Sequence, residues 1–92
     1  MQFEWDPHKA TTNFRKHRIR FETAIRVFLD PHRIETLDDT DDYGEERWKT
    51  IGLVEPDLLV VIYTFRGDND QIIRMISARK AETYEKEQYR EV

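Results

Sequence analysis

The stretch that decides the fold is Leu58-Leu59-Val60-Val61-Ile62-Tyr63-Thr64-Phe65. It is apolar without polar alternation and rich in β-branched and aromatic residues, which is typical of a strand buried on both faces. Turn-forming residues bound it, with Glu55-Pro56-Asp57 before it and Gly67-Asp68-Asn69-Asp70 after it. The pattern therefore predicts a central strand that is entered and left through tight turns.

The flanking sequence predicts further strands on both sides of this run. Residues 47–54 and 71–77 are the expected neighbours, residues 32–37 form a candidate fourth strand, and Phe3-Glu4-Trp5 forms a short first one. Because the turns between the later strands are short, we expect an antiparallel meander.

Three helices are expected around this sheet. Asp6 can cap a helix that has Pro7 at its first position and runs to about His17. Apolar residues at Phe21, Ala24, Ile25 and Phe28 follow helical spacing and predict a second helix, and residues 79–90 predict a third. The fold class is therefore α+β, with two N-terminal helices and one C-terminal helix.

Length and composition restrict the chain to one small domain, residues 1–92. Two Trp, four Tyr and five Phe argue against disorder, and the absence of Cys excludes disulfides, thiolate metal sites and a cysteine nucleophile. The longest apolar run is too short to cross a bilayer, and the first residues lack the features of a signal peptide. A cytoplasmic protein without membrane association is expected.

Charge is distributed unevenly along the chain. The net charge is −4, but residues 1–33 hold seven basic and four acidic side chains, whereas residues 34–57 hold two basic and nine acidic ones. Residues 58–92 are balanced, with six of each. Local basic surface can attract nucleic acid over about 8–10 Å even though the whole protein is acidic. A mixed surface that serves only solubility is the ordinary alternative.

Several kinds of chemistry lack their motifs. His8, His17 and His32 are not at metal-ligand spacing, and the acidic run Asp38–Asp42 is not followed by the glycine and glutamate of a calcium loop. No glycine-rich phosphate loop and no G-x-S-x-G motif occurs. Neither a metal nor another cofactor is therefore expected.

The remaining polar side chains are compatible with RNA cleavage that needs no metal. This reaction requires a base for the ribose 2′-OH proton, cations for the charge on the phosphate, and an acid for the leaving 5′-oxygen. The alternative for each residue is structural: solvated charge, an exposed ion pair or packing. Candidate catalytic residues are Arg66, Arg79, Glu45, Arg47 and His17, and candidate RNA-binding residues are Lys9, Lys16, Arg18 and Tyr84.

Two groups of motifs give the chain a family resemblance. The opening contains Phe3-Glu4-Trp5-Asp6-Pro7, Lys16-His17 and Asp30-Pro31, and the remainder contains Gly44-Glu45 and Ile76-Ser77-Ala78-Arg79, followed by Ala81, Glu85 and Tyr89. Together they resemble the BrnT family, toxins of bacterial type II toxin–antitoxin pairs. The likeness extends over nearly the whole chain.

This resemblance implies a RelE-like ribonuclease fold and RNA cleavage that arrests translation. It also implies a BrnA-type antitoxin as partner, a complex of two toxins with two antitoxins, and contact with DNA only through the antitoxin. By position, Arg66 and Arg79 match arginines of the family and would bind phosphate. Arg18 departs from the pattern, since family members usually carry Gly after Lys-His; it would either contact phosphate or change the turn.

Spacing places the two arginines far apart. If residues 67–70 form the hairpin loop, Arg66 lies opposite Gln71 and Arg79 lies eight residues further, roughly 26 Å along the strand. They would share a face without holding one phosphate, unless the strand ends or bends before Arg79. Arg66, grouped with Glu45 and Arg47 near the acidic loop, is therefore the more secure part of the candidate site.

Two other functions remain open at this stage. A non-catalytic module that only holds a partner protein is compatible with the residues, because none of them demands catalysis. A DNA-binding repressor is less compatible, since no helix-turn-helix with a basic recognition helix is visible and the net charge is −4. A neighbouring gene for a short protein with a basic DNA-binding segment would favour the toxin.

Overall fold

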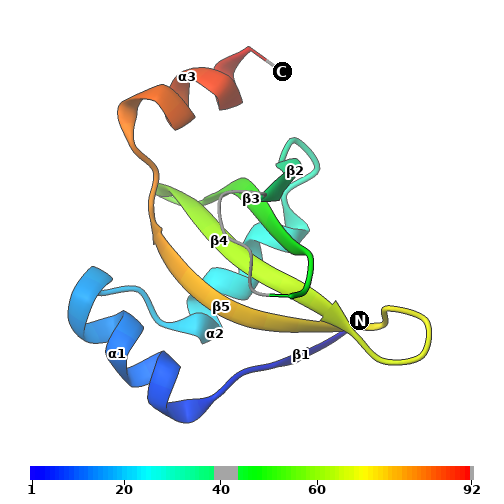
Figure 1. Ribbon diagram of the computed structural model, residues 1–92. Helices are drawn as coiled ribbons and strands as arrows, with labels where there is room; N and C mark the ends of the chain where they lie inside the picture. Colours follow the sequence, from blue (N-terminus) through cyan, green and yellow to red (C-terminus); the bar gives the residue numbers. More distant parts are fainter. Residues whose placement is uncertain (39–43, 92) are drawn as a thin grey trace.

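The apolar run forms the middle of a five-stranded sheet in the computed structural model, which describes residues 1–38 and 44–91. The prediction that Val60 to Tyr63 belong to the central strand is confirmed, and residues 39–43 of the expected acidic loop lie outside the described residues. The sheet order is β1-β5-β4-β3-β2 (Figure 1). The strands are β1 (Gln2–Glu4), β2 (Ile34–Asp38), β3 (Arg47–Val54), β4 (Asp57–Arg66) and β5 (Ile72–Lys80).

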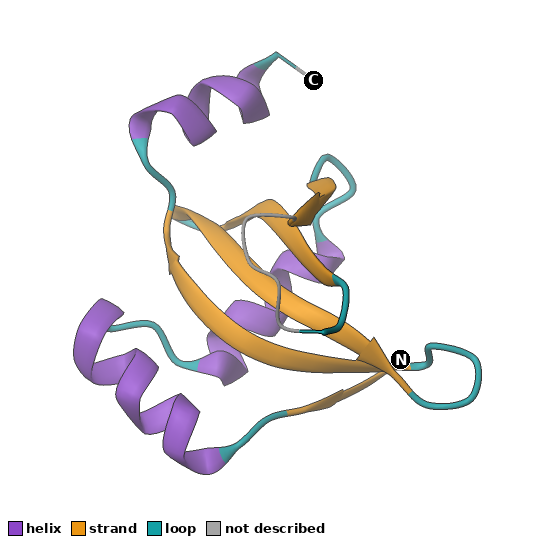
Figure 2. Cartoon of the chain, in the orientation of Figure 1, coloured by secondary structure: helices purple, strands orange, loops and turns teal. Residues whose placement is uncertain are grey.

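The helices follow the predicted order, with one change. They are α1 (Pro7–His17), α2 (Phe21–Ala24) and α3 (Thr83–Arg90), and a 3₁₀ helix, η1 (Ile25–Leu29), directly continues α2. The single amphipathic helix expected over residues 21–28 is thus two short pieces. Figure 2 shows α3 set apart from the other helices, beyond the far end of β5.

The two faces of β4 pack against different layers, as its unbroken apolar sequence requires. Leu59, Val61 and Tyr63 belong to a core that includes Phe21 and Val27 from α2 and η1. A smaller core on the other face is formed by residues from β2, β3, β4 and the C-terminal segment: Ile51, Val60, Ala81, Leu58, Ile62, Ile34 and Tyr89. Among the described helices, α3 is the one that contributes to this second core, through Tyr89.

A glycine explains why η1 lies so close to the sheet. A Cβ built on Gly52 of β3 would lie 2.9 Å from the Cβ of Val27 and 3.2 Å from its carbonyl oxygen. Real Cβ atoms do not approach each other this closely, so only glycine permits the contact. Close packing of η1 on β3 accompanies the tightening of this helix from α to 3₁₀ geometry.

The prediction of a purely antiparallel sheet is wrong at one edge. β2 to β5 form the expected antiparallel meander, but β1 runs parallel to β5, with Gln2 opposite Ile72 and Glu4 opposite Arg74. The chain between them includes helices that cross the sheet, which is the connection that a parallel pair requires. The sheet is therefore mixed.

The predicted boundary between the last strand and the last helix is also wrong. β5 continues to Lys80 because β4, which begins at Asp57, still supplies pairing partners there. Leu59 of β4 lies opposite Lys80. Arg79 thus lies within the strand, opposite Val60, and does not begin the helix. The helix starts only after Glu82, whose side chain and that of Glu85 form a reciprocal capping box.

A carboxamide closes the edge of β5 that β1 leaves open. β1 pairs with residues 72–74 only, and α1 lies beside the rest of the strand. Asn13 of α1 is buried; its Nδ2 donates to the carbonyls of Ala78 (2.9 Å) and Ile19 (3.0 Å), and its Oδ1 accepts from the Ala78 N–H (3.0 Å). The side chain therefore takes the place of a neighbouring strand.

We expect Asn13→Ala to lower the free energy of unfolding by about 2–4 kcal/mol, because both buried polar groups of Ala78 lose their partner. Asn13→Asp should be at least as unfavourable, since a carboxylate would face two carbonyl oxygens. Thr12→Ala, an exposed change on the same helix, is the control and should stay within about 0.5 kcal/mol. Urea unfolding measures all three; an Asn13→Ala protein as stable as the control would contradict this role.

Candidate functional site

The most basic part of the chain is α1 together with the turn that follows it. Residues 7–21 contain five Lys and Arg side chains and no Asp or Glu, in a protein whose net charge is −4. Lys9, Arg15 and Lys16 are exposed on α1, and Arg18 and Arg20 are exposed in the turn. This segment is therefore a local cationic surface, of the kind that attracts a phosphate backbone.

A groove of about 290 Å³ lies between α1 and the bulged part of β5. It combines basic and imidazole side chains with the small polar side chains of both elements. Its lining residues are His8, Lys9, Thr12, Asn13, Lys16, His17, Ile76 and Ser77. Three predicted site residues, Lys9, Lys16 and His17, are thus brought together, and the contact of Asn13 with β5 fixes their distance from that strand.

His17 is the group in this groove that is adapted to accept a proton. Partial burial and the positive charges of Lys16 and Arg79 lower its pKa from 6.5. The imidazole is therefore mainly neutral at pH 7, the form that accepts a proton. The influence of Arg79 on His17 also shows that the groove and the end of β5 form one electrostatic environment.

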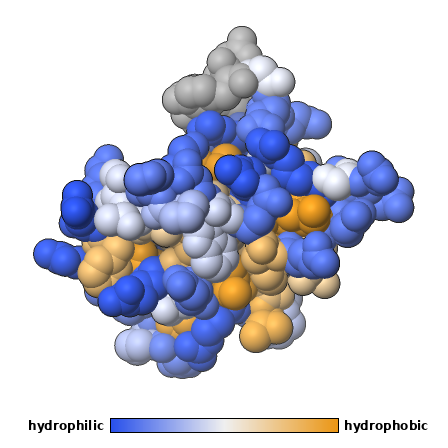
Figure 3. Space-filling model, turned by 90° about the horizontal axis from the view of Figure 1, so that it is seen from below, coloured by the Kyte–Doolittle hydropathy of each residue, from blue (hydrophilic) through white to orange (hydrophobic). Residues whose placement is uncertain are grey.

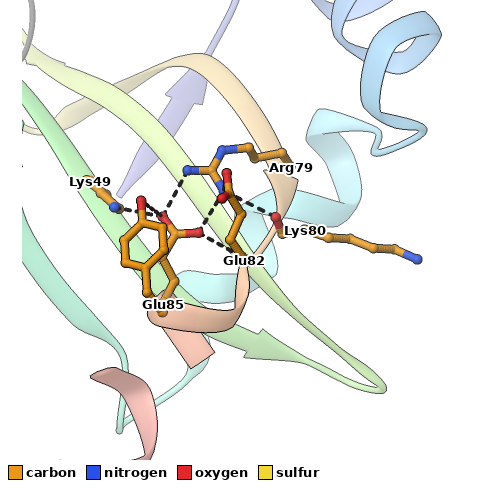
Figure 4. A network of polar contacts seen from close by, with 6 residues as sticks. Lys49, Arg79, Lys80, Glu82 and Glu85 are labelled. Carbon is orange, nitrogen blue, oxygen red and sulfur yellow. Dashed lines mark hydrogen bonds and ion pairs between the residues drawn. The ribbon is translucent and has the colours of Figure 1, made fainter. Parts of the chain in front are cut away.

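Arg79 belongs to a network on the α3 side of the sheet (Figure 4). Its Nη1 donates to Oε1 of Glu85 at 2.7 Å, and its Nη2 donates to Oε2 at 2.8 Å. Nζ of Lys49 lies 2.7 Å from the same Oε2. The Glu85 side chain is fully buried, whereas Arg79 and Lys49 keep 29% and 22% of their side-chain surface exposed. Two cations that solvent can reach thus share one carboxylate that solvent cannot reach.

The electrostatics of this network favour the charged forms of Glu85 and Arg79. Hydrogen bonds from Arg79, the Glu82 backbone and Lys49 outweigh burial and lower the pKa of Glu85 to about 2. The hydrogen bonds with Glu85 raise the pKa of Arg79. A buried carboxylate is tolerated only when it is paired in this way. The pair of Glu85 and Arg79 is therefore ionised throughout the physiological pH range.

Tyr84 extends the network toward solvent. Its side chain is among the exposed large hydrophobic ones, its hydroxyl lies 3.3 Å from Oε2 of Glu85, and Lys49 lies 5.5 Å from the centre of its ring. Tyr84, a candidate RNA-binding residue, is thus near Arg79, because both side chains contact Oε2 of Glu85. Lys49 and Glu85 were not among the candidate site residues. In β3, side chains alternate between the two faces of the sheet, and Lys49 lies opposite Ile62 on the α3 face. This alternation is the signal that could have identified Lys49.

Arg66 and Glu45 lie at the other end of the same face. Arg66 pairs with Glu45 at 3.3 Å, and both side chains are substantially exposed. Arg66 was expected opposite Gln71, but in the sheet it lies opposite Ile72. The pairing of β4 with β5 also shifts register between Ile62 and Tyr63. Arg79 lies opposite Val60, six residues before Arg66 on β4, which corresponds to about 20 Å. The two arginines therefore share a face but not a phosphate.

Arg47 and Arg18 occupy different surroundings. Arg47 begins β3, where it is opposite Asp38 of β2. Arg18 follows α1 in the left-handed conformation (φ 61°), and its N–H donates to Phe14 at 2.8 Å. The turn expected of a glycine is thus retained by an arginine, and Arg18 points its guanidinium over the Phe14 ring, 5.6 Å from the centre.

A second groove lies on the other side of α1, facing α2, with a volume of about 430 Å³. Trp5, Phe14 and Phe21 give it an aromatic floor, and the Arg20 guanidinium lies 4.4 Å from the centre of the Phe14 ring. Figure 3 shows the molecule from below, the side on which α1 lies in Figure 1, and there apolar residues are surrounded by hydrophilic ones. This surface can accept an apolar side chain of a partner.

Within residues 1–38 and 44–91, no group of three His, Asp or Glu side chains is arranged to hold a metal ion. None of the helices in that part of the chain is long and apolar enough to span a bilayer.

Comparisons with known proteins agree with the resemblance drawn from the motifs. A family model described as ribonuclease toxin, BrnT, of type II toxin–antitoxin system matches residues 5–85. The crystal structure of the Brucella abortus ribonuclease toxin BrnT is similar to this chain, with 26% sequence identity and a TM-score of 0.67, over 90% of this chain and 99% of that one. Curated protein sequences gave no match. Since the family match covers most of the 92 residues, this chain belongs to the BrnT family of ribonuclease toxins of type II toxin–antitoxin systems.

Proposed function

We propose that this protein is an endoribonuclease toxin that cleaves RNA between α1 and α3, at His17 and Arg79, and thereby arrests translation in the manner of RelE-like toxins. The observation that carries the proposal is an imidazole in a cationic groove: Lys9 and Lys16 line the groove with His17, and burial, followed by the charges of Lys16 and Arg79, lowers the pKa of His17. An RNA backbone supplies the negative charge that such a surface attracts.

The proposed reaction uses side chains alone. His17 accepts the proton of a ribose 2′-OH, and the 2′-oxygen attacks the adjacent phosphorus while the bond to the 5′-oxygen breaks. The 5′-oxygen takes up a proton from solvent, which leaves a 2′,3′-cyclic phosphate and a 5′-hydroxyl. Arg79 and Lys16 stabilise the charge that develops on the phosphate oxygens.

The exposed residues around this centre bind the rest of the strand. Lys9 and Arg18 are placed for neighbouring phosphates, and Tyr84 offers a ring on which a base can stack. Arg66, which is paired with Glu45, lies about 20 Å along the sheet from Arg79, too far for the same phosphate, and Arg47 begins β3. We propose that they contact a more distant part of the strand.

The partner that neutralises the toxin is an antitoxin of the BrnA type, in a complex of two toxins and two antitoxins. In this complex the antitoxin contacts DNA, and the toxin does so only through it. The aromatic groove between α1 and α2 is the proposed anchor for it. An antitoxin seated there would also cover Lys9, Lys16, Arg18 and Arg20 and so exclude RNA without entering the groove beside β5. A standard interface takes about 800 Å² from each partner, so contact can extend from the aromatic groove onto the exposed basic side chains of α1.

Arg79→Ala should reduce RNA cleavage by about 10²–10³-fold, because one donor that stabilises the transition-state charge is lost. Arg66→Ala removes the same side chain from the same face and should reduce cleavage by about fivefold or less, since its exposed pair with Glu45 contributes little. Single-turnover cleavage of a labelled RNA oligonucleotide measures both. The reverse order of effects would move the reaction to the Arg66 end of the sheet.

Cleavage should depend on the neutral form of His17. Because its pKa lies below 6.5, the rate should stay constant as pH falls through neutrality and decline only below pH 6.5. His17→Gln should abolish this decline and lower the rate by about 10²–10⁴-fold. The profile is measured in EDTA, where wild-type activity should persist because no step uses a metal. A decline centred above pH 6.5, or loss of activity in EDTA, would contradict the mechanism.

Expression of the protein alone should stop growth, and co-expression of its antitoxin should restore it. In vitro, the preformed complex should neither bind nor cleave RNA, because the basic surface of α1 is covered. Phe14→Ala should weaken antitoxin binding while Thr12→Ala, on the other side of the helix, should not. A complex that cleaves RNA as well as the free protein would disprove inhibition by occlusion.

A further inference from the structure

We propose that Glu85 of α3 is a positioning residue of the RNA site: it holds one edge of the Arg79 guanidinium so that the opposite edge, with Lys49 beside it, binds an RNA phosphate. The inference rests on the proposed function, and it assigns a role to two residues, Glu85 and Lys49, that the motifs for catalysis did not include.

The donors of Arg79 can be counted. A guanidinium has five N–H groups, two on each Nη and one on Nε. Glu85 accepts one from Nη1 and one from Nη2, and the carbonyl of Lys80 lies 3.3 Å from Nη1 and accepts its second hydrogen. None of the contacts among the described residues involves Nε. Nε–H and the second Nη2 hydrogen therefore remain, and they lie on one edge of the group, in the geometry that binds a phosphate bidentately.

Burial separates the two edges. The Glu85 side chain has no exposed surface, so neither water nor a ligand competes for the edge that it holds. Arg79 keeps 29% of its side-chain surface exposed and Lys49 keeps 22%. A phosphate can thus reach both cations without displacing the carboxylate between them. Since an ammonium group carries three donors, Lys49 can bind Glu85 and phosphate together.

Glu85 is itself held in place at several points. The Glu82 N–H donates to its Oε1 at 2.8 Å, which is half of the capping box that begins α3. The N–H of Ala81 donates to the carbonyl of Leu58 at 2.9 Å, and near the end of α3 the hydroxyl of Tyr89 donates to Asp30 at 2.6 Å. Both ends of the helix are thus fastened to the sheet region, and the carboxylate cannot swing away from Arg79.

A positioning role and a purely electrostatic role of Glu85 predict opposite changes in RNA affinity when its charge is removed. Removing a negative charge makes the protein more positive, so Glu85→Gln would strengthen RNA binding if Glu85 only neutralised its neighbours. If Glu85 orients Arg79, the same change weakens binding, because an amide cannot accept with both of its arms. Glu87→Gln removes the same charge from an exposed position of the same helix and is the matched control.

The test uses the full chain and two probes: a single-stranded RNA oligonucleotide, and the same sequence fully 2′-O-methylated so that it cannot be cleaved. Glu85→Gln should bind the methylated probe about tenfold more weakly, and its kcat on the cleavable RNA should fall more than its KM rises. Glu87→Gln should bind both probes as tightly as the wild type or more tightly. Arg79→Lys keeps the charge, but an ammonium group cannot bind Glu85 along one edge and a phosphate bidentately along another as a guanidinium can. This variant should therefore behave like Glu85→Gln.

Folding is measured for every variant by urea unfolding. If Glu85→Gln does not fold, Arg79→Lys and Glu85→Asp decide the question. Arg79→Lys should lose binding of the methylated probe, and Glu85→Asp should bind this probe more tightly than Arg79→Lys does. If the wild type cleaves no RNA, the proposed function fails, while binding of the methylated probe still decides the role of Glu85. Wild-type or tighter binding by folded Glu85→Gln or Arg79→Lys would overturn the inference.

Discussion

The arrangement of the site depends on a single buried carboxamide. Asn13 satisfies both backbone polar groups of Ala78 on the edge of β5 that faces away from β4 and that β1 does not reach. This contact fixes α1 against β5 at the residue before Arg79. Lys16 and His17, one turn further along the helix, are therefore held near the arginine whose charge lowers the pKa of His17. Hydrogen bonds hold a helix at a defined distance from a strand, because their length and angle vary little.

Charge separation completes the arrangement. The basic residues of α1 and its following turn have no acidic neighbours in sequence, while the acidic residues are concentrated between positions 34 and 57. Arg79 and Lys49 are two neighbouring cations on the second face of the sheet, and the buried Glu85 keeps them in defined positions. Salt screens charges beyond about 8–10 Å, so RNA close to the protein is affected mainly by the nearest side chains. A protein with net charge −4 can thus present a locally positive surface to RNA.

Much of this fold follows from the sequence. The unbroken apolar run identifies the central strand, Asp6 and Pro7 identify the start of α1, and the short turns identify the meander. The parallel pairing of β1 could not be predicted, because three residues carry no signal of direction and the partner is distant in the chain. The end of β5 was misplaced because Arg79 and Lys80 are as compatible with a helix as with a strand, and pairing with β4 decides between them.

The candidate site was predictable in part. Charge and the family resemblance identify His17, Lys9, Lys16 and Arg79, and the structure brings them into one region. The sequence also favoured Arg66 with Glu45, which do form a pair but at the opposite end of the sheet. Lys49 belongs to no motif, and Glu85 belongs to the family pattern without a chemical role being evident from its position in the sequence; only the folded chain makes both of them partners of Arg79.

The location of the bound RNA tests the central claim most directly. A crystal structure of the protein with a short RNA that carries 2′-O-methyl groups would show it. The account predicts a phosphate within hydrogen-bond distance of Nε and Nη2 of Arg79, with the imidazole of His17 beside the neighbouring 2′-oxygen. A strand that lies along Arg66 and Glu45, with no phosphate at Arg79 and no ribose near His17, would contradict it.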